Sequence, residues 1–215
     1  MNTSWNKCAL ALAMSSFLAA CSSGSGSSSS ASASDTSSDS ADNAEQTVVA
    51  KKTPVDYSLI SDANFSQCLQ DTGIAFTEQL QMLECADYNI QTIDGIEQFQ
   101  ELRVLNLKLN KVEDATPLAS VMKLAHLDIS HNGVQDLSIL APLSSLKTLV
   151  ANDKALTSLN GVEALSSLTR LYVSNNRIAS LEPVSSLNAI EHLTAENNPA
   201  ALPLSMPGTL QTFRI

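Results

Sequence analysis

Residues 102–112 read Leu-Arg-Val-Leu-Asn-Leu-Lys-Leu-Asn-Lys-Val, and they place leucine at positions 102, 105 and 107. The same spacing of small or apolar residues returns every 22 residues in both directions along the chain. The other matches are Leu80, Leu83 and Cys85; Leu124, Leu127 and Ile129; Leu146, Leu149 and Ala151; Leu168, Leu171 and Val173; and Ile190, Leu193 and Ala195. A fixed period of this length predicts a solenoid, in which stacked coils share one interior.

Each repeat divides into two halves with different apolar spacing. The alternation Leu105-Asn106-Leu107 predicts a short strand, and successive strands are expected to form a parallel sheet. The second half has apolar residues three apart, which favours 3₁₀ turns over long helices. These are Val112, Ala115 and Leu118; Val134, Leu137 and Leu140; Leu156, Leu159 and Val162; and Ile178, Leu181 and Val184. Because strands pack more closely than such turns, we expect the sheet on the concave side.

Residues 102–112 resemble a leucine-rich repeat of the 22-residue class, as in the internalin-type bacterial proteins. The resemblance covers residues 80–215, as six units and a partial last strand at Leu210, Phe213 and Ile215, which arrives after 20 residues. It implies an α/β fold: a right-handed solenoid with a concave parallel sheet, convex 3₁₀ or irregular turns and a small N-terminal helical cap. It also implies protein–protein recognition through the concave face.

The family pattern places asparagine at a fixed turn position, where its amide bonds neighbouring turns in a ladder. The matching residues here are Asn110, Asn132, Asn176 and Asn198. Tyr88 and Lys154 occupy this position in the first and fourth repeats. We therefore expect local irregularity at the fourth repeat, with Asn152 and Asp153 as imperfect substitutes.

Residues 53–79 do not follow the repeat, and they predict a cap for its open end. Ser61 or Asp62 can begin a short helix, and Gly73 can end it. Terminal repeats need such a cap because their apolar face has no neighbour.

Two cysteines fall where this cap meets the first repeat. Phe65, Cys68 and Leu69 share one helix face, and Cys85 occupies a core position of the first repeat. A disulfide between Cys68 and Cys85 would close a loop of 16 residues and contribute about 3 kcal/mol in the chain-entropy model. The alternative is a pair of buried thiols.

Residues 1–20 have the features of a secretory signal peptide, with a basic Lys7 and an apolar run too short to span a bilayer. The end of this run, Leu18-Ala19-Ala20-Cys21, resembles the lipobox of bacterial lipoproteins and implies lipidation of Cys21. The alternative is an ordinary signal peptide in which Cys21 is incidental. Residues 21–52 are rich in Ser, Ala and Asp and predict a disordered tether.

The expected location is the cell envelope. Ser22 is not the aspartate that commonly retains such lipoproteins at the inner membrane, so the resemblance points to the outer membrane. After removal of the signal peptide, the chain has 11 basic and 22 acidic residues. This charge argues against binding to nucleic acid and against direct adsorption to anionic lipid.

The sequence offers little for catalysis. His126 and His192 share one position of the repeat but lie three repeats apart, about 14 Å at the spacing of neighbouring strands. They cannot share a metal ion at that distance. No phosphate-binding loop or metal-ligand spacing occurs. We therefore expect no cofactor, no metal and no enzymatic activity; an enzyme or small-ligand carrier is the least favoured reading.

The residues expected to face outward from the strands decide what the concave face can bind. They are Val104, Asn106 and Lys108; His126, Asp128 and Ser130; Thr148, Val150 and Asn152; Arg170, Tyr172 and Ser174; and His192, Thr194 and Glu196. Taken singly, each position is adequately explained as solvated sheet surface. Tyr and Arg are enriched in binding hot spots, so Tyr172 and Arg170 are the expected anchors. The expected additional contacts are Val150, His126, Asp128 and His192.

A structural role is the main alternative to partner recognition. In that case the last strand, near Phe213, would pair with a second copy through its open edge.

Overall fold

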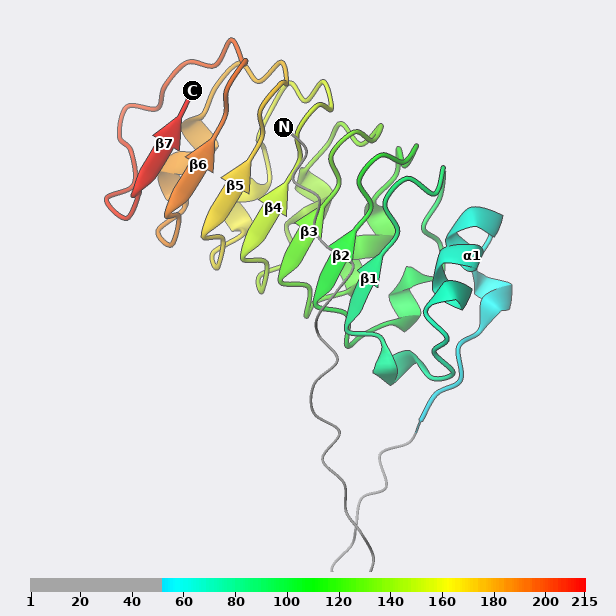
Figure 1. Ribbon diagram of the computed structural model, residues 1–215. Helices are drawn as coiled ribbons and strands as arrows, with labels where there is room; N and C mark the ends of the chain where they lie inside the picture. Colours follow the sequence, from blue (N-terminus) through cyan, green and yellow to red (C-terminus); the bar gives the residue numbers. More distant parts are fainter. Residues whose placement is uncertain (1–51) are drawn as a thin grey trace, which may run out of the picture. The chain divides into compact units, whose positions relative to one another are not determined.

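The computed structural model describes residues 52–215, and seven short parallel strands form its single open sheet (Figure 1). The strands lie side by side in chain order, so each coil of the chain adds one strand. Their bounds are β1 (Met82–Glu84), β2 (Val104–Asn106), β3 (His126–Asp128), β4 (Thr148–Val150), β5 (Arg170–Tyr172), β6 (His192–Thr194) and β7 (Thr212–Arg214). This is the solenoid that the spacing predicts.

One column of apolar side chains runs through the interior from strand to strand. Its members are Leu83, Leu105, Leu127, Leu149, Leu171, Leu193 and Phe213. The six leucines are at most 1% exposed, whereas Phe213 at the end of the stack is only partly buried. The register moves by 22 residues between successive strands and by 20 at β7, as the sequence predicts.

Short 3₁₀ turns form the other side of the five coils between β1 and β6, behind the sheet in Figure 1. They span Ile96–Gln98, Thr116–Ser120, Ser138–Leu140, Val162–Ala164 and Glu182–Ser186. Gly161 precedes one of them with a φ of 96°, and a Cβ at this position would lie 2.3 Å from the Cα of Ser138. Only glycine allows the two coils to approach so closely here.

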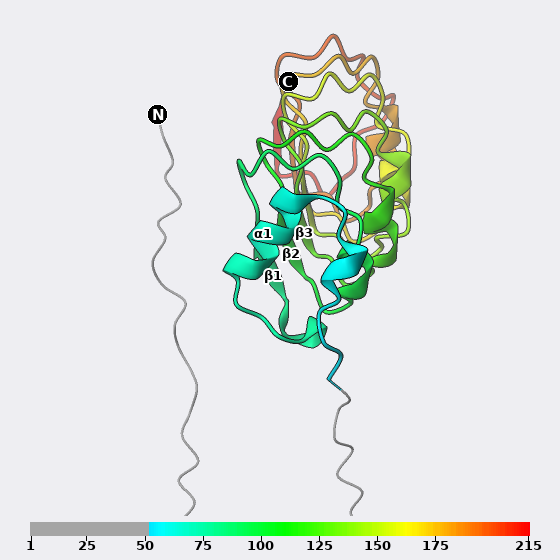
Figure 2. The ribbon, with the colours of Figure 1, turned by 90° about the vertical axis from the view of Figure 1, so that its right-hand side faces the viewer.

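Helix α1 (Ala63–Asp71) covers the β1 end of the stack (Figure 2). Further 3₁₀ turns at Tyr57–Leu59 and Thr77–Gln79 flank it. Phe65, Cys68 and Leu69 are its buried residues. They extend the interior of the solenoid into the cap.

Asp62 joins this helix to the first coil. Its Oδ1 accepts hydrogen bonds from the amides of Asn64 and Phe65 at 2.8 and 3.0 Å, which caps the helix. Its Oδ2 accepts from the amides of Gln91 and Thr92 at 2.7 and 3.3 Å. Burial alone would raise the pKa of Asp62, but these four amides together hold it below its ordinary value.

A disulfide links Cys68 of α1 to Cys85, just after β1. The two Cα atoms are 5.8 Å apart, and neither residue is more than 2% exposed. The pair therefore forms a covalent link between cap and first coil, and not two buried thiols.

Four asparagine side chains each join their coil to the one before it. The Nδ2 of Asn110 donates to the carbonyls of Cys85 and Leu107 at 2.7 and 2.8 Å, and its Oδ1 accepts from the amide of Ile90 at 2.9 Å. Asn132, Asn176 and Asn198 make the equivalent bonds in their own coils. We call these four side chains the asparagine ladder. It pairs carbonyls that would otherwise be buried without a donor.

The expected signal peptide of residues 1–20, the lipidation of Cys21 and the tether of residues 21–52 lie outside the described residues, apart from Lys52. Between residues 52 and 215, no helix is both long and apolar enough to cross a lipid bilayer.

Candidate functional site

Two rows of side chains cover the outer face of the sheet, because every second residue of a strand points to the same side. The first row is Met82, Val104, His126, Thr148, Arg170, His192 and Thr212. The second row is Glu84, Asn106, Asp128, Val150, Tyr172, Thr194 and Arg214. None of these side chains is buried, so both rows are accessible to a partner.

Four of the predicted contact residues form one contiguous patch. Tyr172 lies directly opposite Val150 on the neighbouring strand, and Arg170 lies directly opposite His192. Arg170 and Tyr172 are two residues apart on β5 and therefore face the same side. We call these four residues the β4–β6 patch. It combines an aromatic ring, an aliphatic side chain and two nitrogen donors.

The other two predicted contacts, His126 and Asp128, lie on β3 at the margin of this patch, where Asp128 is directly opposite Val150. Val150 separates Asp128 from Tyr172 in the second row. The Oδ1 of Asp128 also accepts a hydrogen bond from the amide of Ser130 at 2.9 Å. Asp128 therefore supports the end of its own strand as well as facing outward.

The expectation that Ser130 faces outward is wrong, because this residue is only 2% exposed and is not part of the open face. Its Oγ accepts a hydrogen bond from the amide of Asn152 at 3.2 Å. The Oδ1 of Asn152 in turn accepts from the amide of Ser174 at 2.7 Å. Polar side chains just beyond the strands thus join neighbouring coils.

Lys154 is a buried basic residue whose contact with a neighbouring coil is not evident from the repeat pattern. It takes the ladder position of the fourth coil, where it is only 4% exposed. Its Nζ donates to the carbonyl of Ile129 at 3.1 Å, the carbonyl that a ladder asparagine would reach. Lys154 itself, and neither Asn152 nor Asp153, therefore replaces the donor group of the missing asparagine.

The burial of Lys154 carries an electrostatic cost. Desolvation lowers the pKa of Lys154 from 10.5 to about 7, against the opposing attraction of Asp128. Burial therefore favours the neutral amine of Lys154 over its charged form.

The backbone also departs from the repeat where the ladder is missing. One non-glycine residue recurs with a positive φ in the turn after each strand from β1 to β6, at the position that Leu109 occupies with 60°. The members of this series are Asp87, Leu109, His131, Asp153, Asn175 and Asn197. Only the first and fourth coils add a second such residue in the same turn, Asn89 and Ala155. The irregularity expected at the fourth repeat is thus present, as an extra left-handed residue after Lys154.

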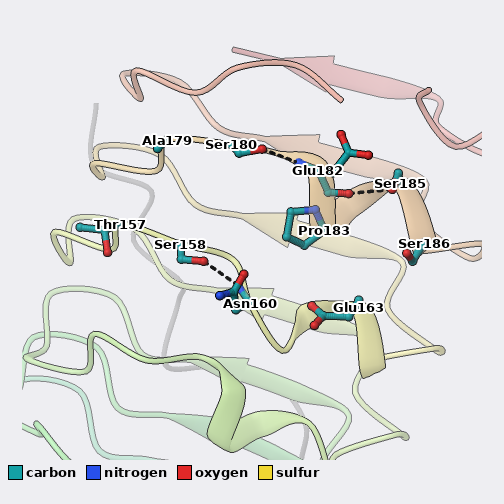
Figure 3. A pocket seen from close by; sticks show the side chains of 10 residues that line it. All are labelled: Thr157, Ser158, Asn160, Glu163, Ala179, Ser180, Glu182, Pro183, Ser185 and Ser186. Atoms are coloured by element: carbon teal, nitrogen blue, oxygen red, sulfur yellow. Dashed lines mark hydrogen bonds between the residues drawn. The ribbon is translucent and has the colours of Figure 1, made fainter. Parts of the chain in front are cut away.

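A hollow on the convex side lies between the fourth and fifth coils (Figure 3). Hydroxyl side chains and two acidic residues, Glu163 and Glu182, line much of it. Several of these groups are engaged locally: Glu163 accepts from the amide of Gly161 at 2.7 Å, and Ser180 accepts from the amide of Glu182 at 3.1 Å. The hollow is therefore mainly a gap between turns, with no converging set of free polar groups.

In the part of the chain that the structure covers, no three His, Cys, Asp or Glu side chains come together as metal ligands.

Comparisons with known proteins agree with this architecture. A family model described as "Leucine Rich repeat" matches residues 122–141. The crystal structure of an internalin C2 from Listeria monocytogenes is 28% identical with a TM-score of 0.70, over 77% of this chain and 78% of that one. An internalin (inlF) from the same organism is 21% identical with a TM-score of 0.66, over 78% of this chain and 59% of that one. No curated protein matches significantly.

The second structure shows a likeness of fold alone, and this chain spans about three fifths of its length. The family model and the internalin C2 structure together support an internalin-like leucine-rich-repeat architecture for this chain.

Lys154 makes the stability of the fold depend on pH. Between about pH 7 and 10.5, the unfolded chain keeps a proton that folded Lys154 has lost, so the free energy of unfolding rises with pH in this window. One group contributes a slope of at most about 1.4 kcal/mol per pH unit. Replacement by methionine, Lys154→Met, should remove this slope and stabilise the fold most at the low end of the window.

Urea unfolding across this pH window measures the effect. The control is Lys147→Met, which removes the same charge at an exposed position and should keep the wild-type slope. Parallel slopes in the wild-type protein and Lys154→Met would show that Lys154 is charged throughout and that its burial has been misjudged.

Proposed function

We propose that this internalin-like leucine-rich-repeat protein recognises a protein partner through the concave face of its sheet. Such folds serve as protein-binding scaffolds, and the likeness to an internalin C2 supports the same general role here. The single observation that carries the proposal is the β4–β6 patch. It places Tyr172 beside Val150 and Arg170 beside His192 on an open surface built from rigid strands.

The composition of this patch suits recognition more than catalysis. Tyrosine and arginine supply a large part of the binding energy in protein interfaces, since they combine broad contact area with hydrogen-bond donors. Arg170 is exposed and Tyr172 is half-buried, so each can lose further solvent contact when a partner binds. A surface of this kind positions a partner without requiring a deep cavity.

The cellular setting is part of the proposal. The lipobox-like Leu18-Ala19-Ala20-Cys21 and the tether sequence that follows support export and lipid anchoring at Cys21, with the outer membrane as the favoured location. The Cys68–Cys85 disulfide is consistent with an oxidising compartment outside the cytoplasm. The solenoid would then be a binding head held off a membrane by residues 21–52.

The double variant Tyr172→Ala with Arg170→Ala should abolish capture of the partner from envelope extract. Neither side chain supports the core, so the melting temperature should stay within a few degrees of the wild-type value. Affinity capture followed by quantitative mass spectrometry measures the loss. A matched control, Arg177→Ala with Met122→Ala, changes two exposed residues off the two rows and should retain capture.

Undiminished capture by the Tyr172/Arg170 double variant would exclude the β4–β6 patch as the binding surface. Loss of capture by the control as well would indicate a general effect on the fold.

Self-association is the second candidate, and the exposed apolar end of the stack favours it. Leu204 is fully exposed, and Leu202 and Ile215 are more than half exposed. Among the described strands, β7 pairs with β6 alone, so its other edge is open to another strand.

In this case the molar mass from light scattering should rise with protein concentration, and Leu204→Glu should reduce that rise because it places a charge in the apolar contact. Thr157→Glu, at an exposed position far from β7, is the control. A single monomeric mass at every concentration would rule this candidate out.

A further inference from the structure

Charge divides unevenly between the two ends of the sheet face. Across β1, β2 and β3, the two rows contain the carboxylates of Glu84 and Asp128 and no lysine or arginine. Across β4 to β7, the same rows contain Arg170, His192 and Arg214 and no carboxylate. The face therefore has a basic half within a protein whose net charge is −10.

The two halves also differ in how far their charged groups are already satisfied. Glu84 accepts a hydrogen bond from the Nδ2 of Asn106 at 2.8 Å, and Asp128 accepts one from the amide of Ser130 at 2.9 Å. Within residues 52–215, the guanidinium groups of Arg170 and Arg214 have neither a hydrogen-bond acceptor nor an ion-pair partner. Both arginines are exposed. The acidic half is internally engaged, whereas the basic half is available to an incoming anion.

The spacing of the arginines fits a short stretch of polypeptide. Arg170 and Arg214 lie two strands and two residues apart, which corresponds to about 12 Å between their Cα atoms. An extended segment covers that distance in about four residues. Thr194 lies between them on β6, and Tyr172 lies two residues from Arg170 on β5, so both side chains can contact the intervening residues of the segment.

The surroundings favour a peptide over a polyanion. Glu191 directly precedes β6 and Glu196 follows it, so acidic residues border the basic half on both sides. A nucleic acid or an anionic membrane would bring many phosphates against these carboxylates and against the overall negative charge. A short segment with a few carboxylates can contact the two arginines without bringing charge against the bordering acidic residues.

We propose that the partner presents an acidic segment to β5–β7, with carboxylates bound by Arg170 and Arg214 and adjoining side chains packed on Tyr172 and Val150. This inference rests on the proposed function and specifies the chemistry of the partner at the same face. Each arginine can bind a carboxylate through two parallel hydrogen bonds, which gives orientation as well as attraction.

The test uses a fluorescein-labelled Glu-Gly repeat peptide as the probe and a Gln-Gly peptide of equal length as the uncharged comparison. Fluorescence anisotropy at low salt should show that the wild-type protein binds the Glu-Gly peptide and not the Gln-Gly peptide. The double reversal Arg170→Glu with Arg214→Glu should weaken binding at least about tenfold, which corresponds to about 1.4 kcal/mol. Arg177→Glu reverses the charge of an exposed residue outside the two rows. Tested alone, this variant should bind the Glu-Gly peptide with an affinity within about twofold of the wild-type value, so it measures the effect of net charge.

Three results would overturn the inference: equal binding of both peptides, no binding of the Glu-Gly peptide, or an equally large loss in Arg177→Glu. Urea unfolding of each variant confirms that the fold is retained. Capture of the natural partner separates this inference from the proposed function. If capture depends on Tyr172 but survives both reversals, the acidic segment is wrong and recognition at the sheet face remains; if capture does not depend on Tyr172, the proposed function itself fails.

Discussion

The asparagine ladder is the constraint on which the rest of the structure depends. A coil of this solenoid turns sharply after its strand, and the turn buries carbonyl groups that its own backbone cannot pair. The amide of Asn132 supplies the missing donors to Leu107 in the preceding coil and to Ile129 in its own, and its Oδ1 accepts from the amide of Val112. The buried carbonyls of one coil therefore find their donors in the next coil, and a single coil has no stable form alone.

The two coils without a ladder asparagine show what this constraint costs. In the first coil, Tyr88 reaches back to helix α1 through its hydroxyl, which donates to Asp71 at 3.0 Å. In the fourth coil, Lys154 reaches back to the carbonyl of Ile129. Both coils then need an additional left-handed residue in the turn. The stack thus tolerates a change of side chain at this position as long as the new group still donates to the preceding element, at the cost of backbone strain and, for Lys154, of a buried amine whose charged form is destabilised.

Much of this architecture could be predicted from the spacing of apolar residues, because the register of a parallel stack follows directly from the repeat. Even the shortened step to β7 is visible in the positions of Leu210 and Phe213. Contacts made by long polar side chains across coils could not be read in this way. The sequence shows that position 154 has lysine in place of the expected asparagine, but only the fold brings the amine of Lys154 to a carbonyl 25 residues earlier. The burial of Ser130 was missed for the same reason, since its partner Asn152 lies one coil away.

This stacking also determines which side chains are neighbours on the outer face of the sheet. Tyr172, Val150 and Arg170 lie together only because successive coils stay in register. The most direct test of the account is urea unfolding of Asn132→Ala, with Asn188→Ala at an exposed position as the control. The account predicts one cooperative transition, a loss of about 2–4 kcal/mol for the ladder variant because several buried groups lose their partners, and almost none for the control. A loss below about 0.5 kcal/mol in Asn132→Ala would contradict the account, because the measured effect of an exposed substitution is of that size.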